Sequence, residues 1–226
     1  MNDAIPTSTR GEPTREALIR AAIEIFGRDG FNAASTRAIS EAAGVNQALI
    51  GYHFGGKPGL YLAALRFIAS SVATRLGPLA ESIETELAAD TGNRARRKNA
   101  ERALAALQEL VGAFVGMLAS DESADWARII LREQQNPSDG FDVLYHGFMH
   151  RMLGIVSELV ARAQNRGAAA ADCKLTAFTI VGQALVFRAA RAVVMRELQW
   201  RQLGATELEA IRAQLKRNIA AIVQAE

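Results

Sequence analysis

Two short helical patterns joined by a tight turn, between Thr36 and Leu60, constrain the fold of this chain more than any other segment. Ser35 stands where a helix N-cap is expected, because its hydroxyl oxygen can accept a hydrogen bond from a free backbone N–H. Gly44 follows the first helix, and glycine readily adopts the left-handed backbone conformation that a tight turn requires. Asn46 can cap the second helix, which we expect over residues 47–52. This order of caps, helices and turn predicts a helix-turn-helix.

The rest of the chain repeats a helical periodicity. Apolar residues recur three or four positions apart from Pro13 or Thr14 to Asp29, and Gly30 should end that helix. The same spacing predicts further helices at about 58–88, 99–119, 122–135, 139–165, 173–201 and 206–224. Because half of the residues are hydrophobic, 22% are charged and only five are proline, we expect a folded, all-α protein.

The pattern divides the chain into three parts. We expect a flexible arm at residues 1–12, a helix-turn-helix domain at 13–57, and a larger helical domain at 58–226. Pro58 suits the first turn of the long helix that opens the third part. Cys173 is the only cysteine, which fits a reducing cytoplasm. No run of about 18 apolar residues is present, so we expect no membrane span.

The second helix of such a motif can enter the major groove of double-stranded DNA and present its N-terminal residues to base edges. Here those residues are Asn46, Gln47, Ala48 and Gly51. Gln47 is the best candidate for direct readout, since its amide can bond bidentately to adenine. The small Ala48 and Gly51 should keep this face slim enough for close approach.

Phosphate contacts need hydrogen-bond donors at fixed places. The predicted donors are Ser35, Thr36, Arg37, Tyr52, His53 and Lys57. The first 57 residues carry six basic and six acidic groups, so any attraction for DNA must come from the placement of charges. Taken singly, a residue such as His53 is more often a surface or capping histidine than a ligand, and Tyr52 could be a core aromatic; their ordered combination is much more specific.

With these motifs in place, residues Thr14 to Leu65 resemble the DNA-binding domain of the TetR family of transcriptional regulators. The matching segments are AAIEIFGRDGFNAAS, RAISEAAGV and ALIGYHFGGKPGLY. The resemblance implies an all-α, Ω-shaped dimer. It makes residues 58–226 an effector-binding and dimerisation domain, which binds a small molecule and releases DNA. It places the recognition helix at Gln47–Tyr52, and it places Tyr52, His53 and Lys57 at phosphate contacts. Ala38 and Gly51 depart from the family pattern, which commonly has an acidic and an aromatic residue there.

A looser resemblance covers the C-terminal part. Ile130–Gln134 with Pro137, and Gly182–Arg188, resemble the effector domain of the CecR-like subgroup. That subgroup is associated with the control of efflux and drug-tolerance genes, but the resemblance implies no particular ligand. Arg132 and Glu133 lie in an otherwise apolar helix, and Arg188 interrupts an apolar one. A buried charge needs a partner, so we hypothesise that Arg188 pairs with Glu133; alternatively, both reach solvent.

The candidate ligand-binding residues are Phe114, Trp126, Arg132, Glu133, Tyr145, His146, Met149 and Arg188. The aromatic residues among them are equally plausible as core residues. His146 and His150 are four residues apart, yet no third ligand is suitably spaced, so we expect no metal and no cofactor. The chain shows no catalytic triad order, phosphate loop or paired carboxylates, which argues against an enzyme.

Two C-terminal segments carry surplus apolar residues. Ala177–Val194 is apolar on nearly every side and should be buried between layers, and the last helix has an apolar stripe from Leu208 to Ile222. We expect a homodimer through these last two helices, although both segments would also serve to close a monomer core. The predicted function is a cytoplasmic, ligand-responsive repressor that binds a near-palindromic operator. The alternative is a helical small-molecule or partner-binding protein that has lost its DNA affinity.

Overall fold

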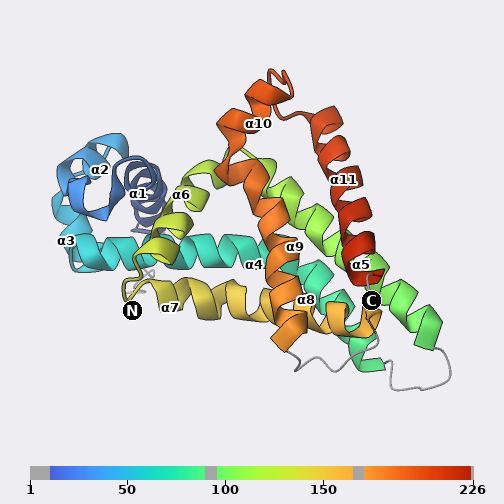
Figure 1. Ribbon diagram of the computed structural model, residues 1–226. Helices are drawn as coiled ribbons and strands as arrows, with labels where there is room; N and C mark the ends of the chain where they lie inside the picture. Colours follow the sequence, from blue (N-terminus) through green and yellow to red (C-terminus); the bar gives the residue numbers. More distant parts are fainter. Residues whose placement is uncertain (1–10, 90–95, 165–170, 225–226) are drawn as a thin grey trace, which may run out of the picture. The chain divides into compact units, whose positions relative to one another are not determined.

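The computed structural model describes residues 11–89, 96–164 and 171–224, and in these ranges the chain is helical and contains no strand (Figure 1). The all-α prediction is therefore confirmed. The elements are α1 Gly11–Ala33, α2 Thr36–Ala42, α3 Ala48–Phe54, α4 Lys57–Ala89, α5 Arg96–Ala119, α6 Ser123–Gln135, α7 Phe141–Leu144, a π-helical turn η2 Tyr145–Met149, α8 His150–Ala163, α9 Ala171–Ala189, α10 Arg191–Glu197 and α11 Ala205–Gln224.

The chain forms two compact units, and the division differs from the predicted boundary at residue 57. Unit 1 comprises the residues up to Ser71 together with Ala124–Gly147. Unit 2 comprises Val72–Ser123 together with the residues from Phe148 onward. Helix α4 therefore contributes to both units, and α6 and α7 belong with the helix-turn-helix. Most of the arm predicted at residues 1–12 lies outside the described residues.

Unit 1 is built around the helix-turn-helix. Leu18 and Phe26 of α1, Ile39 of α2 and Ile50 of α3 are at most 2% exposed and form its core with Leu60 of α4. The predicted end of the first helix is visible as a break inside α1, where Gly30 has φ 80° and ψ 166°. The chain then makes one more short turn of helix to Ala33.

Unit 2 is a layered helical bundle in which α5 contacts α8, α9 and α11. By length and composition alone, the α5 stretch Arg97–Ala119 and the bent pair α9–α10 would be long and apolar enough to cross a membrane. However, α5 buries Leu107, Leu110 and Val115 against the other helices of this bundle, as a core helix does.

Two predicted long helices are interrupted. The helix expected at 139–165 is divided into α7, the π-helical turn and α8. The helix expected at 173–201 ends at Ala189, and α10 leaves it at an angle of 76°. The expectation that Ala177–Val194 is buried between layers is wrong for the single chain, since Phe178 is 58% and Val193 62% exposed.

Candidate nucleic-acid interface

The turn between α2 and α3 follows from the caps seen in the sequence. Ser35 has an extended backbone, and its Oγ accepts a hydrogen bond of 3.0 Å from the Ala38 N–H, so it is the N-cap of α2. Gly44 has φ 66°, in the left-handed region. Asn46 Oδ1 accepts a 2.8 Å hydrogen bond from the Ala48 N–H and so caps the start of α3. These three predictions are confirmed.

The predicted base-reading residues lie together on the outer side of α3. Asn46, Gln47, Ala48 and Gly51 are all exposed, and a Cβ atom added to Gly51 would meet no atom within 4 Å. Ile50, on the opposite side of the helix, is buried in the core of unit 1. Helix α3 therefore has one anchored side and one slim, exposed side, which is the geometry that entry into a groove requires.

Gln47 already has an internal partner. Its Nε2 donates a 2.8 Å hydrogen bond to Oγ1 of Thr36, the first residue of α2. This contact turns the amide nitrogen toward α2. The second N–H of the amide and its Oε1 oxygen remain available, and these two groups are the pair that an adenine edge requires.

The predicted phosphate donors differ in how they are held. Tyr52 is 82% exposed, and its ring meets the His53 ring edge-on with centroids 4.9 Å apart. Arg37 forms an exposed pair with Glu41 at 2.8 Å, and the hydrogen bond that it donates to this carboxylate raises the pKa of the guanidinium. Lys57 is half-buried: its Nζ donates to the Asn32 carbonyl at 3.2 Å and lies 4.8 Å from the Phe31 ring centroid.

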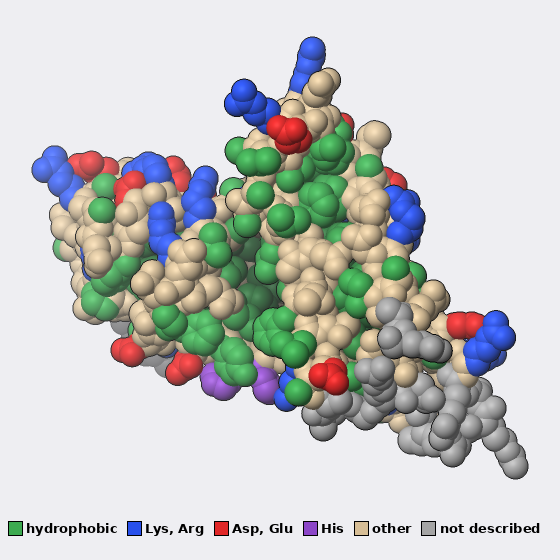
Figure 2. Space-filling model, viewed as in Figure 1, with side chains coloured by type: hydrophobic (Ala, Val, Ile, Leu, Met, Phe, Trp, Pro, Cys, Tyr) green, Lys and Arg blue, Asp and Glu red, His purple; other side chains and the backbone are tan. Residues whose placement is uncertain are grey.

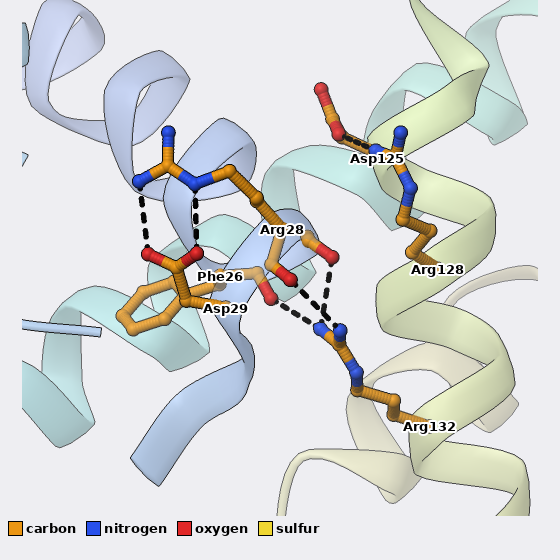
Figure 3. Close-up of polar contacts among 7 residues, drawn as sticks. Phe26, Arg28, Asp29, Asp125, Arg128 and Arg132 are labelled. Carbon is orange, nitrogen blue, oxygen red and sulfur yellow. Dashed lines mark hydrogen bonds and ion pairs between the residues drawn. The ribbon is translucent and has the colours of Figure 1, made fainter. Parts of the chain in front are cut away.

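Helix α6 contacts the end of α1 through one arginine. Arg132 Nη1 donates to the carbonyl oxygens of Phe26 and Gly27 at 2.6 and 2.9 Å, and Nη2 donates to the Arg28 carbonyl at 3.2 Å (Figure 3). Its charge also contributes to lowering the pKa of Asp29, although the main cause is the hydrogen bond from Arg28. This contact could not be predicted from the sequence, because its partners are backbone atoms more than 100 residues away.

The neighbouring Glu133 is 4% exposed and has its own set of partners in unit 1. It accepts a 2.7 Å hydrogen bond from the Tyr61 hydroxyl and further bonds from the N–H and hydroxyl of Ser138. Burial, followed by this hydrogen bond, raises the pKa of Tyr61. These contacts account for the buried carboxylate within unit 1, whereas the hypothesised partner Arg188 belongs to unit 2.

The candidate ligand-binding residues are divided between the two units. Trp126, Arg132, Glu133, Tyr145 and His146 belong to unit 1, and Phe114, Met149 and Arg188 to unit 2. Trp126 is 3% exposed, and the Tyr145 ring stacks on Phe141. Unit 2 has a shallow pocket, but none of the candidates lines it; its lining residues are Ile83, Glu86, Leu87, Asn99, Arg102, Ala103, Ala106, Leu159 and Arg162.

Two further features bear on function. Among the described residues, no group of three or more His, Cys, Asp or Glu side chains is placed to hold a metal ion. Helix α9 exposes Leu175, Phe178, Leu185 and Val186, and Figure 2 shows apolar side chains gathered over α9 and α10. The sequence indicated that this helix was apolar all round, but only the structure shows which side the chain leaves uncovered.

Two family models match the chain, one for each part of it. The model described as "HTH-type transcriptional dual regulator CecR, C-terminal domain" matches residues 103–225, more than half of the chain. The model described as "Bacterial regulatory proteins, tetR family" matches residues 18–64, which contain the helix-turn-helix.

Individual proteins agree with both matches. The transcriptional dual regulator CecR of Shigella flexneri is 29% identical over 217 residues, which cover 95% of this chain and 93% of that protein. The regulatory protein RaaS of Mycobacterium tuberculosis is 53% identical over 60 residues, 26% of this chain and 28% of that protein. A TetR-like regulator from Rhodococcus sp. RHA1 has the same fold, with a TM-score of 0.62 at 16% identity, covering 99% of this chain and 100% of that one. The chain therefore belongs to the TetR family of bacterial transcriptional regulators, with a C-terminal domain of the CecR type, and is a DNA-binding regulator rather than an enzyme.

Proposed function

We propose that this regulator is a cytoplasmic homodimer that binds a near-palindromic operator and represses transcription until a small molecule binds unit 2. The observation that carries the DNA-binding part is the outer side of α3. There, exposed Gln47 is held by Thr36 through a 2.8 Å hydrogen bond, and small residues flank it. We assign base contacts to Asn46, Gln47, Ala48 and Gly51.

Phosphate contacts are assigned to the residues that surround this face: Ser35, Thr36, Arg37, Tyr52, His53 and Lys57. Tyr52 is 82% exposed, so its hydroxyl is accessible to a phosphate. Lys57 has three N–H donors and uses one of them for the Asn32 carbonyl, which leaves two for a phosphate.

The proposed dimer uses α9. Its exposed apolar side includes Leu175 and Phe178, which are 64% and 58% exposed. Exposing such side chains to water is unfavourable in free energy, so covering them would stabilise the protein. A second copy of the chain offers the same side, so a two-fold axis would pair the two copies of α9. Helix α11 plays a smaller part in this proposal, because Ile211, Leu215 and Ile219 already pack into the core of unit 2. A two-fold dimer explains why the operator should be a near-palindrome.

For the effector we propose a site in unit 2, where Phe114, Met149 and Arg188 of the candidate residues lie. Arg132 and Glu133 leave the candidate set, since both side chains already have partners inside unit 1. Mass spectrometry of small molecules that copurify with the full chain tests this part.

The test of DNA binding is a fluorescence-anisotropy titration of the dimer with DNA from upstream of its own gene, repeated at several salt concentrations. We expect binding that weakens steeply with salt, because phosphate contacts release counterions. We also expect random DNA of equal length to bind far more weakly. No binding at low salt would overturn the proposal.

The second candidate is a small-molecule or partner-binding protein that has lost DNA affinity. Two observations favour it: the first 57 residues have no net charge, and Gly51 leaves a gap on the reading face. Equal and weak binding to operator and random DNA in the same titration would support this candidate.

A further inference from the structure

The sequence pair Arg132–Glu133 is not used by the proposed function, yet both side chains make close contacts. Arg132, from another helix, donates hydrogen bonds to the last turn of α1 before its break at Gly30 (Figure 3). The backbone leaves the helix at Gly30, so carbonyl groups in the preceding turn cannot all find partners inside α1. A guanidinium there also faces the negative end of the helix dipole.

Glu133 reaches the same segment from the side of α4. It holds the Tyr61 hydroxyl at 2.7 Å. The Tyr61 ring packs against both Phe26 and Phe31, with centroids 5.0 Å away in each case. Neighbouring residues of α6 therefore fix the stretch from Phe26 to Phe31 from two directions.

This stretch leads directly to the DNA-facing residues. Only Asn32, Ala33 and Ala34 separate Phe31 from the N-cap Ser35. Lys57 ties the same connection to α4, by its bond to the Asn32 carbonyl and its position over the Phe31 ring. Because so few residues connect them, a shift of the end of α1 should also shift the start of α2.

We propose that Arg132 and Glu133 are positioning residues for the DNA-facing helices, Arg132 by capping α1 from α6 and Glu133 by holding Tyr61. The inference rests on the proposed DNA binding. It assigns the pair to holding the reader in place, whereas the sequence had suggested contact with a ligand.

The chain offers a matched control for Arg132. Arg128 lies one turn earlier on the same helix, is exposed, and pairs with Asp125 of that helix (Figure 3). Both arginines can be replaced by methionine, which keeps most of the side-chain length and removes the donors. Arg132→Lys keeps the charge but lacks the planar fork that reaches three carbonyls.

The experiment uses full-length protein and three measurements: operator affinity, the thermal unfolding midpoint, and amide hydrogen exchange at residues 31–37. We expect Arg132→Met to weaken operator binding about tenfold, the order of a typical coupling between separate sites. Exchange at residues 31–37 should become faster. Arg128→Met should leave affinity and exchange as in the wild type, and Arg132→Lys should restore part of both. Tyr61→Phe should change operator affinity and exchange in the same direction as Arg132→Met, but by less.

Either of two results would overturn the inference. One is that Arg132→Met binds the operator like the wild type. The other is that affinity falls only in step with the loss of stability of the whole chain, with no selective change in exchange at residues 31–37. If the wild-type protein itself binds no DNA, the proposed function fails. The exchange comparison between Arg132→Met and Arg128→Met then still decides whether Arg132 positions this segment, and Tyr61→Phe decides the same for the Glu133 contact.

Discussion

The outer side of α3 and the outer side of α9 are both left uncovered by the single chain, but their chemistry is opposite. Around α3 the exposed side chains are mostly polar, and several already bond to one another, as Gln47 does to Thr36. On α9 four of the exposed side chains are large and apolar, and two of them, Leu175 and Phe178, are more than half exposed. A polar surface is stable in water and needs only to be held in shape, whereas an apolar one is stabilised by being covered.

The largest expected effect comes from removing the apolar character of α9. Burying a side chain such as Phe178 or Leu185 is worth about 1.5–3 kcal/mol, and in a two-fold dimer each substitution counts twice. We expect Phe178→Arg to raise the dimer dissociation constant at least ~100-fold, as measured by sedimentation velocity. Operator binding should fall with it.

The control places the same side chain elsewhere in unit 2. Glu109→Arg, at an exposed position of α5, should leave the dimer intact. If Phe178→Arg is as dimeric as the wild type, α9 is not the dimer interface.

The next effect concerns the polar surface around α3. Gln47→Ala should remove discrimination at one base position, worth ~1–3 kcal/mol for a bidentate contact. Thr36→Val keeps the shape of the side chain but removes the oxygen that holds the Gln47 amide. Thr36→Val should reduce discrimination at the same base position, but less than Gln47→Ala does. Thr36→Ser keeps the hydroxyl and should discriminate as the wild type does. Binding to a set of operators that vary at single positions measures this, and an equal loss on all of them would make Thr36 a phosphate contact alone.

Lys57→Ala should have a smaller and less specific effect. Its ammonium group contacts the Asn32 carbonyl and the Phe31 ring within unit 1. We therefore expect a loss of stability of about 1 kcal/mol together with weaker binding to all DNA sequences alike. Denaturant unfolding measures the loss of stability, and titration against the set of operators measures the loss of DNA affinity. A change confined to one base position would contradict the phosphate role.

The smallest effect concerns Tyr61 at alkaline pH. Its folded-state pKa is raised above the ordinary value of 10.0, chiefly by burial and then by the hydrogen bond to Glu133. The neutral hydroxyl is therefore favoured in the folded state, and its contribution to stability is present below pH 10.0 and is lost progressively as the pH rises above that value. Tyr61→Phe should lower the unfolding free energy by about 1 kcal/mol at neutral pH and reduce its fall at alkaline pH. Tyr52→Phe, at a position 82% exposed, serves as the control.

Much of the reading element could be predicted because its determinants are local. Ser35, Gly44 and Asn46 each act on backbone groups within three residues of themselves, so their roles follow from residue type and spacing. The long-range partners could not be found in this way. Arg132 bonds to carbonyl groups, which every residue has, and nothing in the sequence marks those of Phe26 and Gly27.

The C-terminal helices show a second limit. Periodicity predicted an apolar stripe on α11 and apolar residues all round α9, and both are present. It could not say that the α11 stripe packs into unit 2 while part of α9 stays open. The bend after Ala189 also has no sequence signal, since the segment Arg188–Arg191 contains neither proline nor glycine.

The backbone at Gly30 makes this part of the molecule unusually intolerant of sequence change. At φ 80° and ψ 166° it lies in a region that only glycine occupies readily, whereas the turn at Gly44, with φ 66°, suits asparagine nearly as well. In a library of all single substitutions selected for operator binding, position 30 should therefore admit no other residue, and position 44 should admit asparagine. Substitutions on the exposed side of α3 can then change which operator is recognised, while the break at Gly30, which exposes the end of α1 to Arg132, is retained.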